Sequence, residues 1–360
     1  MGAFCWQRIP CHGRQSVVYS HPEVENHSQI GGAMQRTFFR AGALLTAVLL
    51  ALTLIGCGAE PLPDDGRLRI VATNFPGYDL ARSVAGDAAH VQMLLPPGAE
   101  SHSYEPTPRD ILAVQACDLF IYLGGESDAW VENILASIDG GVNTLKMMDC
   151  VADRLLEEEH DHDHDHDGHP DHEAHDHDHG LGEVVEKDEH VWTSPVNAML
   201  IQQAIAAELT RLDGAGAAVY EANLTAYQKE LAEVDQAIAS YVRTLEHPVM
   251  VFGDRFPLRY FAHEYGITCY SAFPGCSTQT EPSAATIAHL TDMVRQEGLG
   301  TVYYIEFSNH LVADSIAEAC GVETALFHSC HNVSRQELEA GVTYLTLMRQ
   351  NLETLKATLK

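Results

Sequence analysis

Positive charge is scarce in this sequence. The 360 residues contain 21 Lys and Arg against 51 Asp and Glu, a formal net charge of −30. A surface of this kind repels the phosphate backbone of nucleic acids, so we expect no nucleic-acid partner. The apolar share of 46% is ordinary for a folded protein. The length suggests about two domains.

The sequence motifs of several large enzyme classes are also missing. The chain has no H-E-x-x-H, G-x-S-x-G or P-loop sequence. His263-Glu264 lacks the second histidine that a zinc protease carries on the next helical turn. We therefore expect a binding protein and not an enzyme, with a zinc hydrolase that uses an open coordination position as the alternative class.

Cysteine pairs of the C-x-x-C type, which hold metals through thiolates, are absent as well. Of the nine cysteines, Cys5 and Cys11 lie near the N-terminus and Cys57 follows an apolar segment. An even set remains, which in an exported protein favours three disulfides, most simply paired within each half of the chain. These six residues are Cys117, Cys150, Cys269, Cys276, Cys320 and Cys330.

The apolar run over residues 41–55 is too short for a comfortable membrane span. It follows Arg36 and Arg40 and ends in Leu-Ile-Gly before Cys57, which resembles the lipobox of a bacterial lipoprotein signal. We expect lipidation of Cys57, although a plain N-terminal anchor is the alternative. The expected segments are an artefactual leader over 1–33 that precedes the true initiator, a signal peptide over 34–56, and a tether over 57–67.

Strands alternate with helices through the remaining chain, which predicts an α/β fold with parallel sheets. Strand patterns occupy residues 68–73, 90–95, 118–123, 249–252, 301–306 and 325–327. Between the two groups, apolar residues from Tyr220 to Tyr241 recur at alternating spacings of four and three, which predicts one long amphipathic helix. We expect two α/β lobes joined by this helix: a first lobe over 68–156 and 190–217, the helix over 218–246, and a second lobe over 247–360.

Residues 157–189 interrupt this pattern with an acidic stretch that has too few apolar residues to fold, so we predict a disordered loop. Residues 160–179 hold nine histidines and eight acidic residues. Imidazoles bind Zn²⁺, and the flanking carboxylates attract cations, so we expect weak, multiple metal capture. The histidines are His160, His162, His164, His166, His169, His172, His175, His177 and His179.

Four other histidines follow predicted strands or the acidic loop. His102 follows a strand of the first half, His190 follows the loop, and His328 and His331 follow a strand of the second half. In α/β sheets, ligands gather beyond the carboxyl ends of the strands, where such loops emerge.

Two longer motifs surround the first two of these histidines. The segment 97–108, PGAESHSYEPTP, and the segment 188–195, DEHVWTSP, resemble the P-G-x-x-x-H-x-Y-E-P-T-P and D-x-H-x-W-x-S-P motifs of the metal-binding proteins that serve ABC importers. The histidine-rich loop is similar to that of the zinc branch of this family. The resemblance covers residues 68–360 and implies two α/β lobes joined by a rigid helix, with the metal between them.

The resemblance also implies a ligand set. His102 and His190 match the two ligands of the first lobe. The family's third ligand follows the first strand of the second lobe, where this chain has Asp254 and no histidine. We expect His328 to replace that imidazole and Asp254 or Glu306 to complete the coordination. His331 is a further candidate, and a loop held by a Cys330 disulfide is the alternative interpretation of this segment.

The resemblance implies a monomeric, extracytoplasmic lipoprotein that binds Zn²⁺ and delivers it to an ABC importer permease, anchored to the membrane by its lipid. A manganese-binding member of the family is one alternative, although three imidazoles favour Zn²⁺ over Mn²⁺. A surface lipoprotein that buffers metal or acts as an adhesin without a permease is the other.

Overall fold

A computed structural model describes residues 62–138, 140–157, 186–273 and 282–360. Cys57, Cys276 and the nine histidines of the acidic loop lie outside these residues. All the described residues belong to one compact unit.

The first lobe contains a four-stranded parallel sheet in the order β2-β1-β3-β4. The central strands β1 and β3 carry the apolar sequences LRIVA and LFIY, and β3 is buried along its whole length. The strands are β1 (Leu68–Ala72), β2 (Ala89–Met93), β3 (Leu119–Tyr122) and β4 (Thr144–Lys146). The helices are α2 (Phe75–Ala85), η1 (Gly86–Ala88), α3 (Pro108–Ala116), η2 (Glu126–Asp128), α4 (Ala129–Ser137) and η3 (Met148–Arg154).

The second lobe repeats this plan with a parallel sheet in the order β6-β5-β7-β8. The strands are β5 (Val249–Arg255), β6 (Thr268–Phe273), β7 (Thr301–Tyr304) and β8 (Glu323–Leu326). The helices are α7 (Arg259–Tyr265), α8 (Ala284–Gln296), α9 (Leu311–Cys320) and α10 (Arg335–Glu339). Two parallel sheets with flanking helices confirm the predicted fold class.

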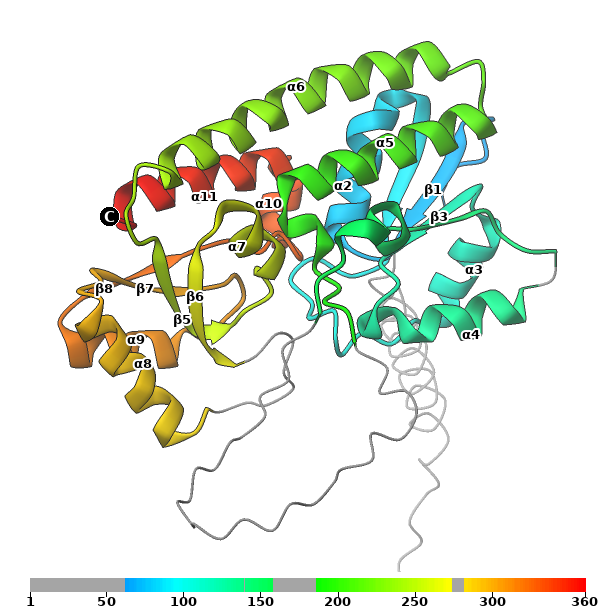
Figure 1. Ribbon diagram of the computed structural model, residues 1–360. Helices are drawn as coiled ribbons and strands as arrows, with labels where there is room; N and C mark the ends of the chain where they lie inside the picture. The colour runs from blue at the N-terminus through cyan, green and yellow to red at the C-terminus, as the bar shows by residue number, and fades with distance from the viewer. Residues whose placement is uncertain (1–61, 139, 158–185, 274–281) are drawn as a thin grey trace, which may run out of the picture. The chain divides into compact units, whose positions relative to one another are not determined.

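Helix α5 (Pro195–Leu212) completes the first lobe. Two helices connect the lobes, α6 (Ala217–Val242) and the C-terminal α11 (Tyr344–Thr358) (Figure 1). Helix α6, predicted over 218–246, has 26 residues and is about 39 Å long. It packs against α2 and α5 of the first lobe and against α11, which returns from the second lobe. No helix among the described residues has both the length and the apolarity that crossing a bilayer requires.

A buried carboxylate fastens these helices to one another. Asp79 on α2 accepts hydrogen bonds from the Tyr344 backbone N–H at the start of α11 and from the Tyr227 hydroxyl on α6. Its other oxygen pairs with Arg82 at 2.6 Å. Burial raises the pKa of the Asp79 carboxyl against the opposing effect of Arg82. One side chain therefore ties the first lobe both to the long helix and to the last helix of the second lobe.

Two expectations from the sequence need correction. The disulfide prediction is wrong for the described cysteines, because Cys117, Cys150, Cys269, Cys320 and Cys330 are free. The thiols of four of them donate to nearby backbone carbonyls instead, for example Cys117 to Val114 and Cys320 to Thr291.

The second correction concerns the predicted disordered loop, which extends too far at both ends. Glu157 and Lys187 form an antiparallel bridge and an ion pair of 3.2 Å. Asp188 and Glu189 are buried. Tyr260 on α7 holds both ends of the segment, since its hydroxyl donates to the Asp188 carbonyl and accepts from the Leu156 N–H.

Candidate metal site between the lobes

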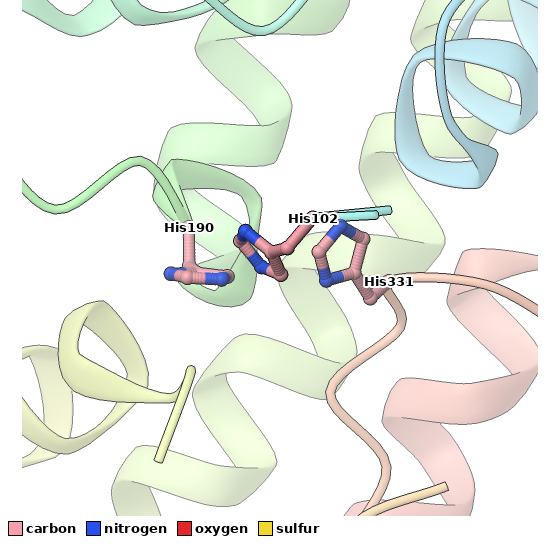
Figure 2. Close-up of side chains that lie close together, drawn as sticks. All are labelled: His102, His190 and His331. Atoms are coloured by element: carbon pink, nitrogen blue, oxygen red, sulfur yellow. The ribbon is translucent and has the colours of Figure 1, made fainter. Parts of the chain in front are cut away.

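Three histidines from distant parts of the sequence converge in one place. His102, His190 and His331 each offer a ring nitrogen, and these three atoms lie within 4.8 Å of one another. The ring centroids form a nearly equilateral triangle with sides of 6.0, 5.5 and 5.6 Å. Figure 2 shows the three rings side by side, with His102 between the other two in that view. Among the described residues, this is the one group of three or more metal-ligating side chains.

The backbone brings His102 and His331 together across the lobes. His102 lies in the loop after β2 and His331 in the loop after β8, so each follows the carboxyl end of a strand. The two loops bond directly to each other. The Asn332 side chain donates to the carbonyls of Pro96 and Ala99, each at 2.9 Å, and the Gly98 N–H donates to the Val333 carbonyl.

His190 is held by its neighbours on both sides. It precedes the short helix η4 (Val191–Thr193), and its Nδ1 lies 3.0 Å from a carboxylate oxygen of Asp188. A carboxylate bonded to one imidazole nitrogen fixes the ring and directs the other nitrogen toward a metal. Burial alone would raise the pKa of the Asp188 carboxyl, but the charge and hydrogen bonds of His190 outweigh it and lower that pKa.

Trp192 forms an apolar wall behind the cluster. It is fully buried, and its ring centroid lies 5.3 Å from that of His190 and 4.9 Å from that of His331. Its indole N–H donates to the Ser329 carbonyl in the loop that carries His331. The Tyr344 hydroxyl donates to the Trp192 carbonyl. One aromatic side chain of the first lobe thus supports histidines from both lobes.

The surroundings of His102 and His331 favour the neutral imidazole, which is the form that binds metal. Burial, followed by the charges of His190 and Arg255, lowers the pKa of His102 to about 4. Burial, followed by the other two histidines, holds the pKa of His331 well below its ordinary range. The Nε2 atom of His331 is buried and has no hydrogen-bond partner in the described structure. A buried polar atom of this kind is costly unless a ligand satisfies it.

His328, the imidazole expected from the sequence, lies outside this cluster. Its Nδ1 accepts the Cys330 N–H at 2.8 Å, and its backbone N–H and carbonyl both bond to the Asn351 side chain. The ring is buried beside Glu306, with 3.5 Å between Nδ1 and a carboxylate oxygen. The structure therefore gives His328 a role inside the loop, three residues before the histidine that faces the other two.

The two carboxylates expected near the metal accept hydrogen bonds from backbone N–H groups. Glu306 accepts from the Ser329 N–H, the Ser329 hydroxyl and the His331 N–H. Asp254 accepts from the N–H groups of Arg255 and Ile305. Both side chains line the cavity of about 420 Å³ that contains His102, His190 and His331. Neither belongs to the group of converging ligand atoms.

Comparison with known proteins agrees with this architecture. The family model described as the periplasmic zinc-uptake complex component A matches residues 70–358. The zinc-binding lipoprotein AdcA of Streptococcus pneumoniae (strain ATCC BAA-255 / R6) is 32% identical over 320 residues, which are 88% of this chain and 60% of AdcA. This chain therefore spans somewhat less than two thirds of that relative. The high-affinity zinc uptake system protein ZnuA of Bacillus subtilis (strain 168) is 31% identical over 297 residues, 81% of this chain and 88% of that protein.

Solved structures give the same result. The Zn(II)-bound ZnuA-like domain of S. pneumoniae AdcA superposes with a TM-score of 0.64 and 28% identity, covering 81% of this chain and 99% of that domain. The metal-dependent lipoprotein YcdH of B. subtilis gives a TM-score of 0.66 and 27% identity, covering 82% of this chain and all of that one. With a family match over most of its length, this chain belongs to the zinc-uptake complex component A family of solute-binding proteins.

Proposed function

We propose that this protein binds Zn²⁺ between its lobes through His102, His190 and His331 and delivers the ion to an ABC importer. The observation that carries this proposal is the convergence of three ring nitrogens within 4.8 Å. Zinc with bonds of about 2.0 Å places tetrahedral nitrogen ligands about 3.3 Å apart, so the rings need to move by no more than about 1.5 Å. Zinc is the cargo of this site, and binding and release require no catalysis.

The donor set favours zinc over manganese. Three imidazoles suit Zn²⁺, whereas Mn²⁺ prefers carboxylate, carbonyl and water oxygens. The two carboxylates in the cavity wall, Asp254 and Glu306, lie outside the group of converging ligand atoms, and both accept backbone N–H groups. The names of AdcA and ZnuA describe zinc binding and zinc uptake in those relatives, which supports the same cargo here.

The proposed location is extracytoplasmic, with the chain anchored to the membrane through a lipid on Cys57. The name of AdcA identifies that relative as a lipoprotein, and the family description is periplasmic. Cys57 precedes the first strand by eleven residues, which provides a short tether. Metabolic labelling with a fatty-acid probe tests the anchor, because the Cys57→Ala chain should take up none of the label that the native chain takes up.

Zinc titration of metal-free protein tests the site. The chain without residues 158–185 should bind one zinc ion tightly, and His102→Ala, His190→Ala and His331→Ala should each weaken binding by at least about 100-fold. Loss of one of three nitrogen donors leaves the ion under-coordinated in a largely buried cleft. Competition with a chelator of known affinity measures the change.

His289→Ala is the matched control, since His289 lies exposed on α8, outside the cluster. It should leave zinc affinity unchanged. If His331→Ala binds zinc as tightly as the native chain while His328→Ala binds it more weakly, the ligand from the second lobe is His328. If none of the three variants changes the affinity, the interlobe site is not where zinc binds.

A further inference from the structure

The residue beside Asp188 points to a different histidine. Glu189 precedes His190 in the sequence, yet its carboxylate lies next to His102, with 3.6 Å between Oε1 and Nδ1. The Glu189 side chain is 7% exposed. Its Oε2 accepts the Ser127 N–H at 3.0 Å, whereas Oε1 is buried and has no hydrogen-bond partner in the described structure. A buried carboxylate oxygen of this kind is costly unless it accepts a hydrogen bond in some working state of the protein.

The first lobe is shaped to accept this side chain. Glu189 reaches the turn after β3 at Gly125, where a Cβ atom would lie only 2.0 Å from Glu189 Oε2 and 2.4 Å from its Cβ. No residue other than glycine fits there without displacing the carboxylate. The same turn is fixed by Asp128, which accepts the N–H groups of Leu123 and Gly124. The position of Glu189 therefore depends on an ordered turn and not on a flexible surface contact.

The chemistry of metal-bound histidine gives this arrangement a purpose. An imidazole that binds a metal through one nitrogen carries a proton on the other, and that N–H usually donates to a carboxylate or carbonyl. Asp188 already occupies this position for His190, at 3.0 Å. For His102, the carboxylate is present but lies 3.6 Å away, slightly beyond hydrogen-bond range. The movement of about 1.5 Å that brings the three rings onto a zinc ion is large enough to close this gap.

We propose that Glu189 is a positioning residue for His102, and that zinc binding completes a hydrogen bond from His102 Nδ1–H to Glu189 Oε1. This inference rests on the proposed zinc site. The two consecutive acids then serve two different ligands, Asp188 for His190 and Glu189 for His102. Both carboxylates hold their imidazoles in one tautomer and increase the basicity of the nitrogen that binds the metal.

The experiment uses the full chain with Glu189→Gln and Glu189→Ala, with Asp188→Asn as a comparison and Glu221→Gln on the exposed side of α6 as the matched control. Loss of a carboxylate that orients a ligand typically weakens metal binding by about 10–100-fold. We expect a loss in this range for Glu189→Ala, a smaller loss for Glu189→Gln, which keeps an acceptor oxygen, and no change for Glu221→Gln. Chelator competition measures these values.

A spectroscopic readout separates positioning from a general structural role. In protein labelled with ¹⁵N-histidine, the zinc-bound native chain should show a slowly exchanging Nδ1–H signal from His102. This signal should move in Glu189→Gln and disappear in Glu189→Ala, while the signal from His190 responds only to Asp188→Asn. Circular dichroism of the metal-free variants reports whether the fold is intact.

The possible failures are distinguishable. If the native chain binds zinc tightly and His102→Ala abolishes binding, but both Glu189 variants keep native affinity and the His102 signal, then Glu189 has no positioning role and the zinc site stands. If Glu189→Ala misfolds, the isosteric Glu189→Gln variant and its His102 signal still decide the matter. If His102→Ala has no effect on zinc binding, the proposed function itself fails.

Discussion

The lowered imidazole pKa values predict that the interlobe site resists acid. The perturbation is a change from pH 7.5 to pH 5.5 in the chain without residues 158–185, which removes the histidine-rich tract. Protons compete with zinc only for imidazoles that become protonated in this range. An ordinary histidine, with a pKa of about 6.5, is about nine-tenths protonated at pH 5.5. Three ordinary ligands would therefore cost about a thousandfold in apparent affinity.

The structure predicts a smaller loss of zinc affinity than this thousandfold value. The pKa of His102 is lowered to about 4 and that of His331 is lowered well below 6.5, so both rings remain mostly neutral at pH 5.5. Two of the three ligands therefore stay available to zinc in this range, so the loss of affinity should be far smaller than the thousandfold expected for three ordinary histidines. The full chain should release the zinc held by its histidine-rich tract first, because weak, multiple sites of this kind have no converged geometry to hold the ion against protons.

The lowered pKa of His102 also affects the stability of the metal-free protein. The unfolded chain takes up a proton at His102 near pH 6.5, whereas the folded metal-free protein does so only near pH 4. Folded protein is therefore destabilised as the pH falls through this window, by about 2 kcal/mol at pH 5 from His102 alone. Urea unfolding of metal-free native and His102→Ala protein at pH 7.5 and pH 5 measures this difference.

Zinc affinity at each pH is measured by competition with a chelator calibrated at that pH, with His289→Ala as the control for histidines outside the cluster. A thousandfold loss of affinity between pH 7.5 and pH 5.5 would contradict the reasoning, since it would mean that the cleft imidazoles titrate like those of a free peptide. An unchanged affinity below pH 4 would indicate an oxygen-rich site instead.

Three further predictions concern the supports of the site. Glu306→Ala should weaken zinc binding by about tenfold or more and Glu306→Gln by less, because the Glu306 carboxylate holds the N–H groups of the loop that carries His331; chelator competition distinguishes the two. Asp79→Ala should lower the free energy of unfolding measured with urea by about 3 kcal/mol, since it removes the ion-pair partner of Arg82 and the acceptor of the buried Tyr344 N–H, whereas Asp292→Ala on the exposed side of α8 should lower it little. Deletion of residues 160–179 should remove several weak zinc ions, keep one tight ion and slow stopped-flow zinc uptake; equal uptake rates would rule out a capture role for the tract.

The fold could be predicted because its signals are local and strong. The run LFIY in β3 is buried on both faces, as expected for a central strand of a parallel sheet. Thr107 and Ser194 each cap a helix that begins with proline, and their side chains accept the N–H of Asp110 and of Asn197, which is a common local signal for the start of a helix. The alternating spacing from Tyr220 to Tyr241 predicts the long helix, because an apolar stripe that recurs every three or four residues is typical of one continuous amphipathic helix.

The site was harder to predict in the second lobe, where the decisive contacts are tertiary. His328 and His331 lie in a loop without periodicity, so the sequence offers no rule for which ring faces the cleft. Cys330 adopts a positive φ of 61°, which turns the chain between them. Asn351 then fixes the backbone of His328 from helix α11, and Glu306 fixes the N–H of His331. The disulfide prediction failed for a similar reason. An even number of cysteines says nothing about the distance between two thiols or the direction of their side chains.

The departure at Asp254 follows from the order of the strands. The resemblance expected a ligand at the end of the first strand of the second lobe. This chain carries there, within β5, the Asp254 carboxylate, which accepts the Ile305 N–H at 3.2 Å and so fastens β5 to the end of β7. The candidate imidazole emerges instead after β8, which is the neighbour of β7 in the same sheet. Carboxyl ends of adjacent parallel strands open onto one edge, so a ligand can move from one strand end to another while the metal position is kept. Asp254 braces the sheet from within β5, and Glu306, which follows β7, holds the N–H groups of the loop that carries His331, the candidate ligand.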